Sequence, residues 1–358
     1  MKVGVIGLNL SGKSTLFALL TGQPPPTPGA RAEARPGVAR VPDARVDALA
    51  AMYRPRKTTY ATVEYVDVPG VAKGEGSALV DLPALRGVDA LMHVVRDFES
   101  DLAPHPDGSV DPLRDARMLD LELILADLGT AERRLERLEA NIKKANRAED
   151  VAERALFTRV KAALEREEPL RAADLGDDER RKLRHYSFLS EKPLLLAVNL
   201  GEDRVRDAAA RLEASGLRAF AARPQVGLVP VSAPIEAEMA QLSAEDAAAF
   251  REDLGLQEPG LDRVIRTSYQ LLGLISFLTA GEDECRAWTI RQGTRAQPAA
   301  GEIHSDIERG FIRAEVVAFD DLMRAGSLAA CREQATLRLE GKDYLVRDGD
   351  VINFRFNV

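Results

Sequence analysis

The chain has 358 residues, of which 45% are hydrophobic and 30% are charged, and its formal net charge is -8. This length predicts two or three domains, and the apolar share excludes a wholly disordered or collagen-like chain. The acidic balance gives no sign of a basic nucleic-acid-binding domain, since even residues 275–358 hold 11 basic and 14 acidic side chains.

Neither a membrane segment nor a disulfide framework is expected. No apolar run reaches the roughly 18 residues that a membrane helix needs, and residues 1–14 do not follow the pattern of a signal peptide. Two cysteines, Cys285 and Cys331, are too few for a disulfide framework or for a metal site of their own. We therefore expect reduced thiols, a cytoplasmic location and no membrane contact.

Five apolar segments predict the strands of one sheet: residues 2–6, 61–68, 88–95, 193–199 and 226–232. The first strand leads into a glycine-containing loop and then a helix expected over about residues 13–20. Near-continuous apolar strands separated by helices indicate a parallel sheet covered on both faces. The expected fold class is α/β, with a doubly wound, mostly parallel sheet formed by residues 1–112 and 191–270.

Residues 113–190 differ in composition, because this segment is rich in charged residues and nearly free of glycine. Apolar residues from Leu121 to Ala145 recur at intervals of three and four, which is typical of a helix with a coiled-coil-like seam. A second periodic stretch begins at Ala152, after a turn near residues 146–150. Two antiparallel helices would form an arm that projects from the sheet domain; the alternative is two helices lying flat on its core.

The C-terminal part has a third pattern. A helix is expected over residues 261–274, followed by short strands at residues 287–291, 312–318, 335–339, 344–346 and 351–356. Gly341 and Gly349 lie in turn sequences between the last strands. Residues 275–358 therefore predict a small, mostly β domain of mixed type.

A phosphate-binding loop is the most specific motif of the sequence. Residues 7–14, GLNLSGKS, match G-x-x-x-x-G-K-[ST] at every fixed position, between a strand and a helix. In such a loop, backbone N–H groups and the helix N-terminus surround an anion. Lys13 adds a charge for the β- and γ-phosphates, and the Ser14 hydroxyl can coordinate Mg²⁺. The nucleotide-binding residues predicted here are Asn9, Leu10, Ser11, Gly12, Lys13, Ser14 and Thr15.

The end of the next predicted strand carries the pattern D-x-x-G, from Asp67 to Gly70. The Asp67 carboxylate at this position can hold Mg²⁺ through a water, and the Gly70 N–H can meet the γ-phosphate. This pair after a phosphate-binding loop favours a GTPase-like switch protein over a nucleotide kinase. The predicted metal ligands are thus Ser14 and Asp67.

Two further strand ends are predicted to contact the base. Asn199, Leu200 and Glu202 occupy the position where GTPases carry N-K-x-D, whose aspartate binds guanine. The basic residue is absent here and Glu202 has a longer side chain than aspartate, so guanine selectivity is open. Ser232 and Ala233 end the following strand and are expected near the base.

These motifs resemble the YchF/Obg-like ATPase family over the whole chain. The segments that carry the resemblance are residues 7–15, 67–70, 199–202, 277–281, 286–290, 300–306, 310–315, 339–343 and 348–350. The resemblance implies a G domain, an inserted coiled-coil arm and a C-terminal TGS domain of β-grasp shape. It further implies Mg²⁺-dependent hydrolysis of ATP, often in preference to GTP, and association with ribosomes. We expect a monomer that contacts the large subunit, and RNA, through the arm and the TGS domain.

The chain departs from the family at two places. Asn9 to Ser11 replace the family's Pro-Asn-Val, and the Mg²⁺-binding threonine aligns with Arg31, which leaves Thr27 as a candidate substitute. Val71 stands where many GTPases place a water-orienting glutamine, although the family also has a hydrophobic residue there. An aliphatic side chain cannot hydrogen-bond the attacking water, so hydrolysis must be slow or use another group.

His105 is the candidate for that group, because it matches a family histidine and has a near-neutral pKa in its ordinary state. The alternative is a solvated loop histidine without a role. The predicted catalytic set is Lys13, Gly70 and His105. Two other functions remain open: a guanine-specific switch, and a nucleotide-stabilised ribosome- or RNA-binding module with negligible hydrolysis.

Overall fold

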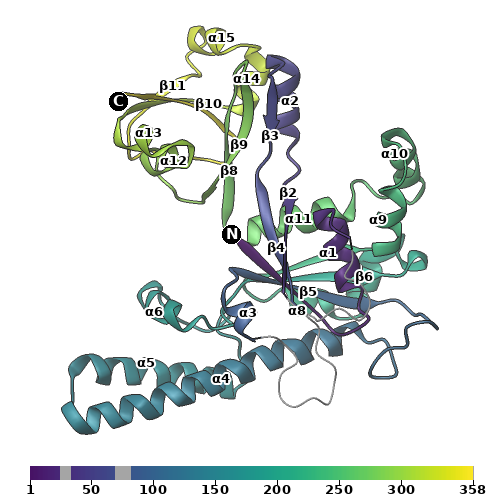
Figure 1. The fold of residues 1–358 in the computed structure, drawn as a ribbon, viewed down its shortest axis with the longest axis vertical. Coiled ribbons are helices and arrows are strands. Elements are labelled where there is room, and N and C mark those ends of the chain that lie inside the picture. Colours follow the sequence, from purple (N-terminus) through teal and green to yellow (C-terminus); the bar gives the residue numbers. More distant parts are fainter. Residues whose placement is uncertain (25–33, 69–81, 358) are drawn as a thin grey trace. The chain divides into compact units, whose positions relative to one another are not determined.

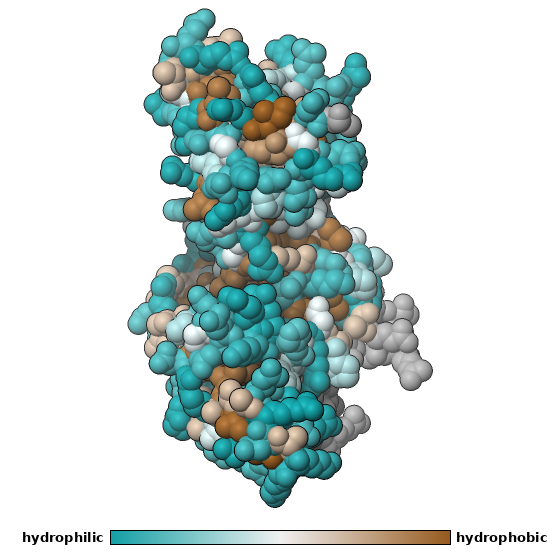
Figure 2. Space-filling model, turned by 90° about the vertical axis from the view of Figure 1, so that its left-hand side faces the viewer, coloured by the Kyte–Doolittle hydropathy of each residue, from teal (hydrophilic) through white to brown (hydrophobic). Residues whose placement is uncertain are grey.

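The computed structural model describes residues 1–24, 34–68 and 82–357. None of the helices in these ranges combines the length and the apolar content that crossing a membrane requires. Figure 2 shows a face on which hydrophilic residues predominate and hydrophobic residues form small, separate groups. The chain divides into two compact units (Figure 1), one made of Met1–Val38 and Glu64–Leu271, the other of Ala39–Val63 and Leu272–Val358.

The first unit is built on a six-stranded sheet with the order β2-β4-β1-β5-β6-β7. Its strands are β1 Lys2–Ile6, β2 Arg35–Arg40, β4 Thr62–Asp67, β5 Ala90–Asp97, β6 Leu194–Leu200 and β7 Val226–Val231. The pairs β1–β4, β1–β5, β5–β6 and β6–β7 are all parallel. Every residue of β5 and β6 is buried, as near-continuous apolar runs predict. The expected α/β, mostly parallel fold is confirmed.

Helices pack against this sheet and join its core. The described helices of the first unit are α1 Lys13–Thr21, α3 Leu82–Arg86, α4 Pro112–Ala145, α5 Ala148–Glu165, α6 Asp177–Leu183, α7 Ala208–Ala214, α8 Leu217–Ala221, α9 Ala233–Met239, α10 Ala244–Asp253 and α11 Gly260–Leu271. Leu119 and Leu123 of α4 share one buried cluster with Val95 of β5 and Leu196 of β6. Because β1, β4, β5, β6 and β7 are parallel, their carboxyl ends lie at one edge of the sheet, where the following loops converge.

The charged insertion forms a helical hairpin. Helix α4 runs for 34 residues and begins where the Asp111 side chain accepts a hydrogen bond from the Arg114 N–H. It ends at Asn146, whose φ of 38° reverses the chain into α5. Beyond the part of α4 that lies on the sheet, Ala131 and Leu138 pack with Leu156 and other residues in a separate cluster. This second cluster favours the projecting arm over two flat helices, and Figure 1 shows α4 and α5 extending away from the sheet.

A buried carboxylate fixes the end of the insertion to α4. Asp127 accepts hydrogen bonds from the backbone N–H groups of Leu189, at 2.9 Å, and Ser190, at 2.7 Å. Burial raises the pKa of Asp127 to about 6, although the hydrogen bonds from Leu189 and Ser190 act in the opposite direction. The folded state therefore binds this proton more tightly than the unfolded chain does.

This pKa predicts a pH-dependent stability. Between pH 5 and pH 7.5, loss of the Asp127 proton should lower the free energy of unfolding by about 1 kcal/mol, because the raised pKa favours the folded state only while the proton is bound. Urea unfolding of wild type and Asp127→Asn should therefore give a stability difference that changes with pH. Asp178→Asn on exposed α6 is the control, and curves for Asp127→Asn that stay parallel to wild type would contradict the prediction.

The second unit contains another six-stranded sheet, in the order β11-β10-β12-β8-β9-β3. Its strands are β3 Lys57–Thr59, β8 Leu274–Thr279, β9 Glu284–Arg291, β10 Phe311–Ala318, β11 Arg338–Glu340 and β12 Asp350–Phe356, and its described helices are α2 Ala44–Tyr53, α12 Ala296–Ile303, α13 Ser305–Arg309, α14 Phe319–Ala325 and α15 Leu328–Glu333. Strand β12 is parallel to β8 and antiparallel to β10, which makes the sheet mixed. Phe277, Ala299 and Phe354 pack in its core.

Three features of this unit differ from the expectation. Residues 39–63 were expected in the first domain, but they belong to the second unit because β3 pairs in parallel with β9, from Lys57↔Glu284 to Thr59↔Arg286. Residues 344–346 were expected as a strand, but only Leu345 forms an isolated bridge, to Arg295. The C-terminal unit also contains four short helices that its apolar alternation did not indicate.

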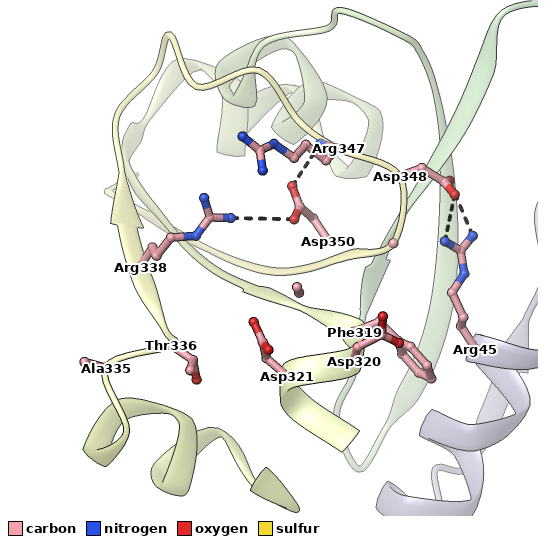
Figure 3. Close-up of a pocket in the computed structure, with 12 residues that line it drawn as sticks. Arg45, Phe319, Asp320, Asp321, Ala335, Thr336, Arg338, Arg347, Asp348 and Asp350 are labelled. Atoms are coloured by element: carbon pink, nitrogen blue, oxygen red, sulfur yellow. Dashed lines mark hydrogen bonds and ion pairs between the residues drawn. The ribbon is translucent and has the colours of Figure 1, made fainter. Parts of the chain in front are cut away.

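A polar pocket of about 420 Å³ lies within the second unit (Figure 3). Arg45 of α2 forms two hydrogen bonds with the Asp348 carboxylate, at 2.8 and 3.4 Å. Asp350 accepts a hydrogen bond from the Arg347 backbone N–H at 2.9 Å and forms an ion pair with Arg338 at 3.7 Å. Several charged side chains of the pocket are thus paired with one another, and the pair of Arg45 with Asp348 connects α2 to the turn before β12.

Candidate functional site

The loop between β1 and α1 adopts a backbone that requires glycine. Gly12 ends the loop with a φ of 86° and caps α1. A Cβ atom on Gly12 would lie 2.2 Å from the Asn199 Nδ2 atom, which is far inside contact distance. Gly7 has a φ of 157°, and its Cβ would lie 2.8 Å from the Val94 carbonyl oxygen. Both fixed glycines of the motif are therefore explained by conformation and space.

The two predicted metal ligands lie together beside Lys13. Parallel pairing of β1 with β4 sets Val5 opposite Asp67 and brings the end of β4 next to the loop. The Lys13 Nζ atom donates to Asp67 Oδ1 at 2.7 Å and to the Val68 carbonyl oxygen, and the Ser14 hydroxyl donates to Asp67 Oδ2 at 3.3 Å. A hydroxyl and a carboxylate at this separation fit Mg²⁺, which prefers oxygen ligands.

Asn199 connects three of the predicted motifs. It is the penultimate residue of the buried strand β6, and its Nδ2 donates to the Ser11 carbonyl oxygen at 3.0 Å. Its Oδ1 accepts a hydrogen bond from the Ala233 N–H at 3.0 Å. One buried amide thus holds the phosphate loop and the start of α9 in fixed positions.

The hydroxyl groups of Ser11 and Ser232 are buried at the same edge of the sheet and are free to bond a ligand. Within the described part of the chain, no partner lies within hydrogen-bond distance of the Ser11 Oγ or the Ser232 Oγ. Buried polar atoms are rarely left unpaired in proteins, and where they are, a bound group is a common reason. Their placement on either side of Asn199 suits a ligand with several polar atoms.

The other predicted residues occupy different environments. Asn9, Leu10 and Thr15 are exposed, as is Glu202 in the 3₁₀ turn Glu202–Arg204. The Leu200 side chain packs in the apolar core, so only its backbone can face a ligand. Four residues discussed for the switch and for water positioning lie outside the described residues: Thr27, Arg31, Gly70 and Val71.

His105 is buried rather than solvated. Its Nε2 lies 2.8 Å from Asp115 Oδ2, and its Nδ1 accepts a hydrogen bond from the Asp107 N–H at 3.1 Å. This pattern corresponds to a neutral ring that carries its proton on Nε2 and donates it to Asp115. Both ring nitrogens are therefore engaged, and a role with water requires the ring to leave Asp115.

Sequence reasoning did not identify Arg96 and Asp97, which end β5 at this edge of the sheet. Both are buried although they are charged, and both contact loops that contain predicted site residues. A pair of charged residues at the carboxyl end of an apolar parallel strand is the pattern that could have revealed them. The described residues hold no cluster of three or more histidine, cysteine or acidic side chains suited to a metal, and both cysteines are free and buried.

Comparisons with known proteins find relatives over the whole length of the chain. Residues 2–125 match a family described as a 50S ribosome-binding GTPase, and residues 274–357 match the C-terminal domain of YchF GTPases, described as a protein of unknown function. The chain is 41% identical over 365 residues to the ribosome-binding ATPase YchF of Bacillus subtilis, with all of both chains covered. It is also 41% identical to the Escherichia coli O157:H7 protein of that name, covering 100% of this chain and 99% of the other. The solved structure of the Schizosaccharomyces pombe YchF GTPase superposes with a TM-score of 0.86 at 30% identity, covering 99% of this chain and 97% of that one.

Proposed function

The chain belongs to the YchF family, and on this premise we propose that it is a Mg²⁺-dependent P-loop NTPase that hydrolyses ATP in preference to GTP and acts as a ribosome-associated switch. The observation that carries the proposal is the double hydrogen bond of Asn199 to Ser11 and Ala233. It joins the phosphate loop to both base-contacting segments, so that one nucleotide can span all three. A chance glycine turn would not be tied to two other strand ends in this way.

The phosphate side of the site provides charge and positioning. Lys13 exchanges its contact with Asp67 for the β- and γ-phosphates, and the N–H groups of the loop, from Asn9 to Thr15, surround the same oxygens. Ser14 and Asp67 hold Mg²⁺, which when bound neutralises charge on the phosphates and polarises the γ-phosphoryl group. Water then adds to the γ-phosphorus, and the bond to the β-γ bridging oxygen breaks to give ADP and phosphate.

Two further groups are assigned to the catalytic step. Gly70 offers its N–H to the γ-phosphate, and His105 positions the attacking water after its ring leaves Asp115. Because Val71 cannot hydrogen-bond water, the rate without a partner is low. This assignment of His105 rests on its match to a family histidine and on its place in the loop that follows β5 at the sheet edge.

The base side of the site supports ATP over GTP. Glu202 is exposed in its 3₁₀ turn, and no basic residue follows Asn199, so the elements that bind guanine in N-K-x-D are changed. Competition between ATP and GTP for the purified protein with Mg²⁺ tests this point. GTP binding more than about tenfold tighter would favour the guanine-specific switch instead.

The ribosome is the proposed partner, through its large subunit and RNA. The tip of the helical arm exposes Lys143, Lys144 and Arg147, which can contact phosphates although the whole chain is acidic. The C-terminal unit, proposed to be a TGS domain, is a second contact. Such a protein works as a cytoplasmic monomer.

Cosedimentation with ribosomes tests the partner. We expect the wild-type protein in the 50S and 70S fractions in one nucleotide state more than in another, and its amount should fall as salt rises. A variant with Lys143, Lys144 and Arg147 changed to glutamine should bind more weakly, whereas one with exposed Glu139 and Glu149 changed to glutamine should not. Absence from both fractions in every nucleotide state would contradict ribosome association.

A further inference from the structure

The end of β5 brings two buried charges to the edge of the sheet where the loops converge. Arg96 and Asp97 are 2% and 1% exposed, and the parallel pairing of β5 with β6 sets them opposite Asn199 and Leu200. They therefore lie directly beside the segment that precedes Glu202. Neither residue takes part in the roles described above.

The hydrogen bonds of the Asp97 side chain go to residues that follow β6 in the chain. Its Oδ1 accepts hydrogen bonds from Arg204 Nη1 at 2.7 Å and Arg211 Nη2 at 2.8 Å, and its Oδ2 accepts from Arg211 Nε at 2.9 Å. Its carbonyl oxygen accepts a hydrogen bond from the Gly201 N–H at 3.1 Å. One residue thus fastens the turn that carries Glu202 at both its ends, through Gly201 and Arg204.

Arg96 fastens the phosphate loop from the same strand end. Its guanidinium donates to the carbonyl oxygens of Leu10 at 3.3 Å, Phe98 at 3.0 Å and Ala103 at 2.7 Å. Leu10 has a φ of 64°, which is costly for a side chain of this kind, and the contact with Arg96 helps to hold it. Adjacent residues of one strand therefore hold the phosphate loop and the base-contacting turn.

The exposed fractions of the Arg204 and Arg211 side chains indicate whether Asp97 positions the turn or mainly stabilises the fold. The side chains of Arg204 and Arg211 are 22% and 40% exposed, so both can return to water if Asp97 loses its charge. Loss of that charge then has a modest effect on folding, because no cation remains buried and unpaired. The larger consequence is a turn that is free to move relative to Asn199.

We propose that Asp97 is a positioning residue for base recognition, which holds residues 201–204 through Arg204 and Arg211 and so sets the affinity for the base. This inference rests on the proposed function. It does not involve the phosphates, which Lys13 and the loop amides bind independently of the turn. Asp97 should therefore matter for a nucleotide and not for a ligand that has phosphates but no base.

The Asp97→Asn variant tests this separation. We expect about tenfold weaker binding of ATP with Mg²⁺, a KM raised by a similar factor and a kcat within about twofold of wild type. Binding of Mg²⁺-tripolyphosphate, the probe without a base, should be unchanged. Asp253→Asn is the matched control, since Asp253 pairs with Arg206 at 3.0 Å between side chains that are 75% and 63% exposed. It should bind both ligands like wild type.

A second variant tests whether Asp97 acts through its arginine partner. Arg204→Gln should also weaken ATP binding, and the double variant Asp97→Asn/Arg204→Gln should bind hardly more weakly than Asp97→Asn alone. Wild-type affinity for ATP in Asp97→Asn, or an equal loss for ATP and tripolyphosphate, would overturn the inference. A wild-type protein that binds no nucleotide would instead contradict the proposed function, and this inference with it.

Discussion

Replacement of Lys13 by alanine is expected to lower the rate of phosphate release from ATP by about a hundredfold or more. The ammonium group lies at the first turn of α1, buried, with its Nζ atom 2.7 Å from Asp67 Oδ1. No other cation of the described residues bonds to Asp67, so Lys13 is the one described cation held at this carboxylate. Phosphate release from saturating ATP with Mg²⁺, measured over single and multiple turnovers, gives the rate.

The control for Lys13→Ala is Lys2→Ala, because Lys2 is a half-exposed lysine on the neighbouring strand that pairs with Glu64. It should leave the rate unchanged. The Lys13 variant also leaves the buried Asp67 without its cation, so unfolding is measured in parallel and assays run below the midpoint of the less stable protein. Equal phosphate release by Lys13→Ala and wild type would mean that the chain has no activity of its own, and would favour the nucleotide-stabilised binding module.

Replacement of Gly12 by alanine is expected to lower the free energy of unfolding by about 2–4 kcal/mol and to abolish tight nucleotide binding. The φ of 86° is strained for alanine, and the new Cβ would lie 2.2 Å from Asn199 Nδ2. Asn199 must then move, which breaks its hydrogen bonds to Ser11 and Ala233. Thermal or urea unfolding measures the first effect, and titration with ATP measures the second.

Gly22→Ala is a closely matched control for this variant. Gly22 ends the same helix with a φ of 67°, and its Cβ would meet no atom within 4 Å. Gly22→Ala therefore carries the same cost of about 1 kcal/mol for a positive φ, but its Cβ does not collide with another atom. If both variants lost the same stability and Gly12→Ala still bound ATP normally, the bridging role assigned to Asn199 would be wrong.

Local sequence patterns were sufficient for much of the first unit. The apolar run from Lys2 to Ile6 gave the observed bounds of β1, and the other four predicted strands overlap β4, β5, β6 and β7. Buried parallel strands can be predicted from sequence because both faces of the sheet are covered, so almost every residue of such a strand is apolar. The periodicity of residues 121–145 likewise predicted α4, because a helix that packs along one side repeats its apolar residues every three or four positions.

The residues that escaped prediction are those whose partners lie far away along the chain. β3 has three residues, Lys57–Thr59, with no apolar alternation, and it is a strand because Glu284 to Arg286 of β9 pair with it. The burial of His105, which decides between its two interpretations, likewise depends on a contact, since Asp115 lies 2.8 Å from its ring. No local rule fixes such contacts, since they depend on how distant elements pack.

By itself, the sequence determined the family, the α/β class, the helical arm and the phosphate-binding loop, because each depends on a short run of residues with a fixed spacing. The tertiary structure decided which residues hold that loop in place. It put Asn199 between Ser11 and Ala233, and it joined Asp97 to Arg204 and Arg211. These contacts arise because parallel strands bring the ends of distant segments to one edge of a sheet, where buried polar groups must find partners.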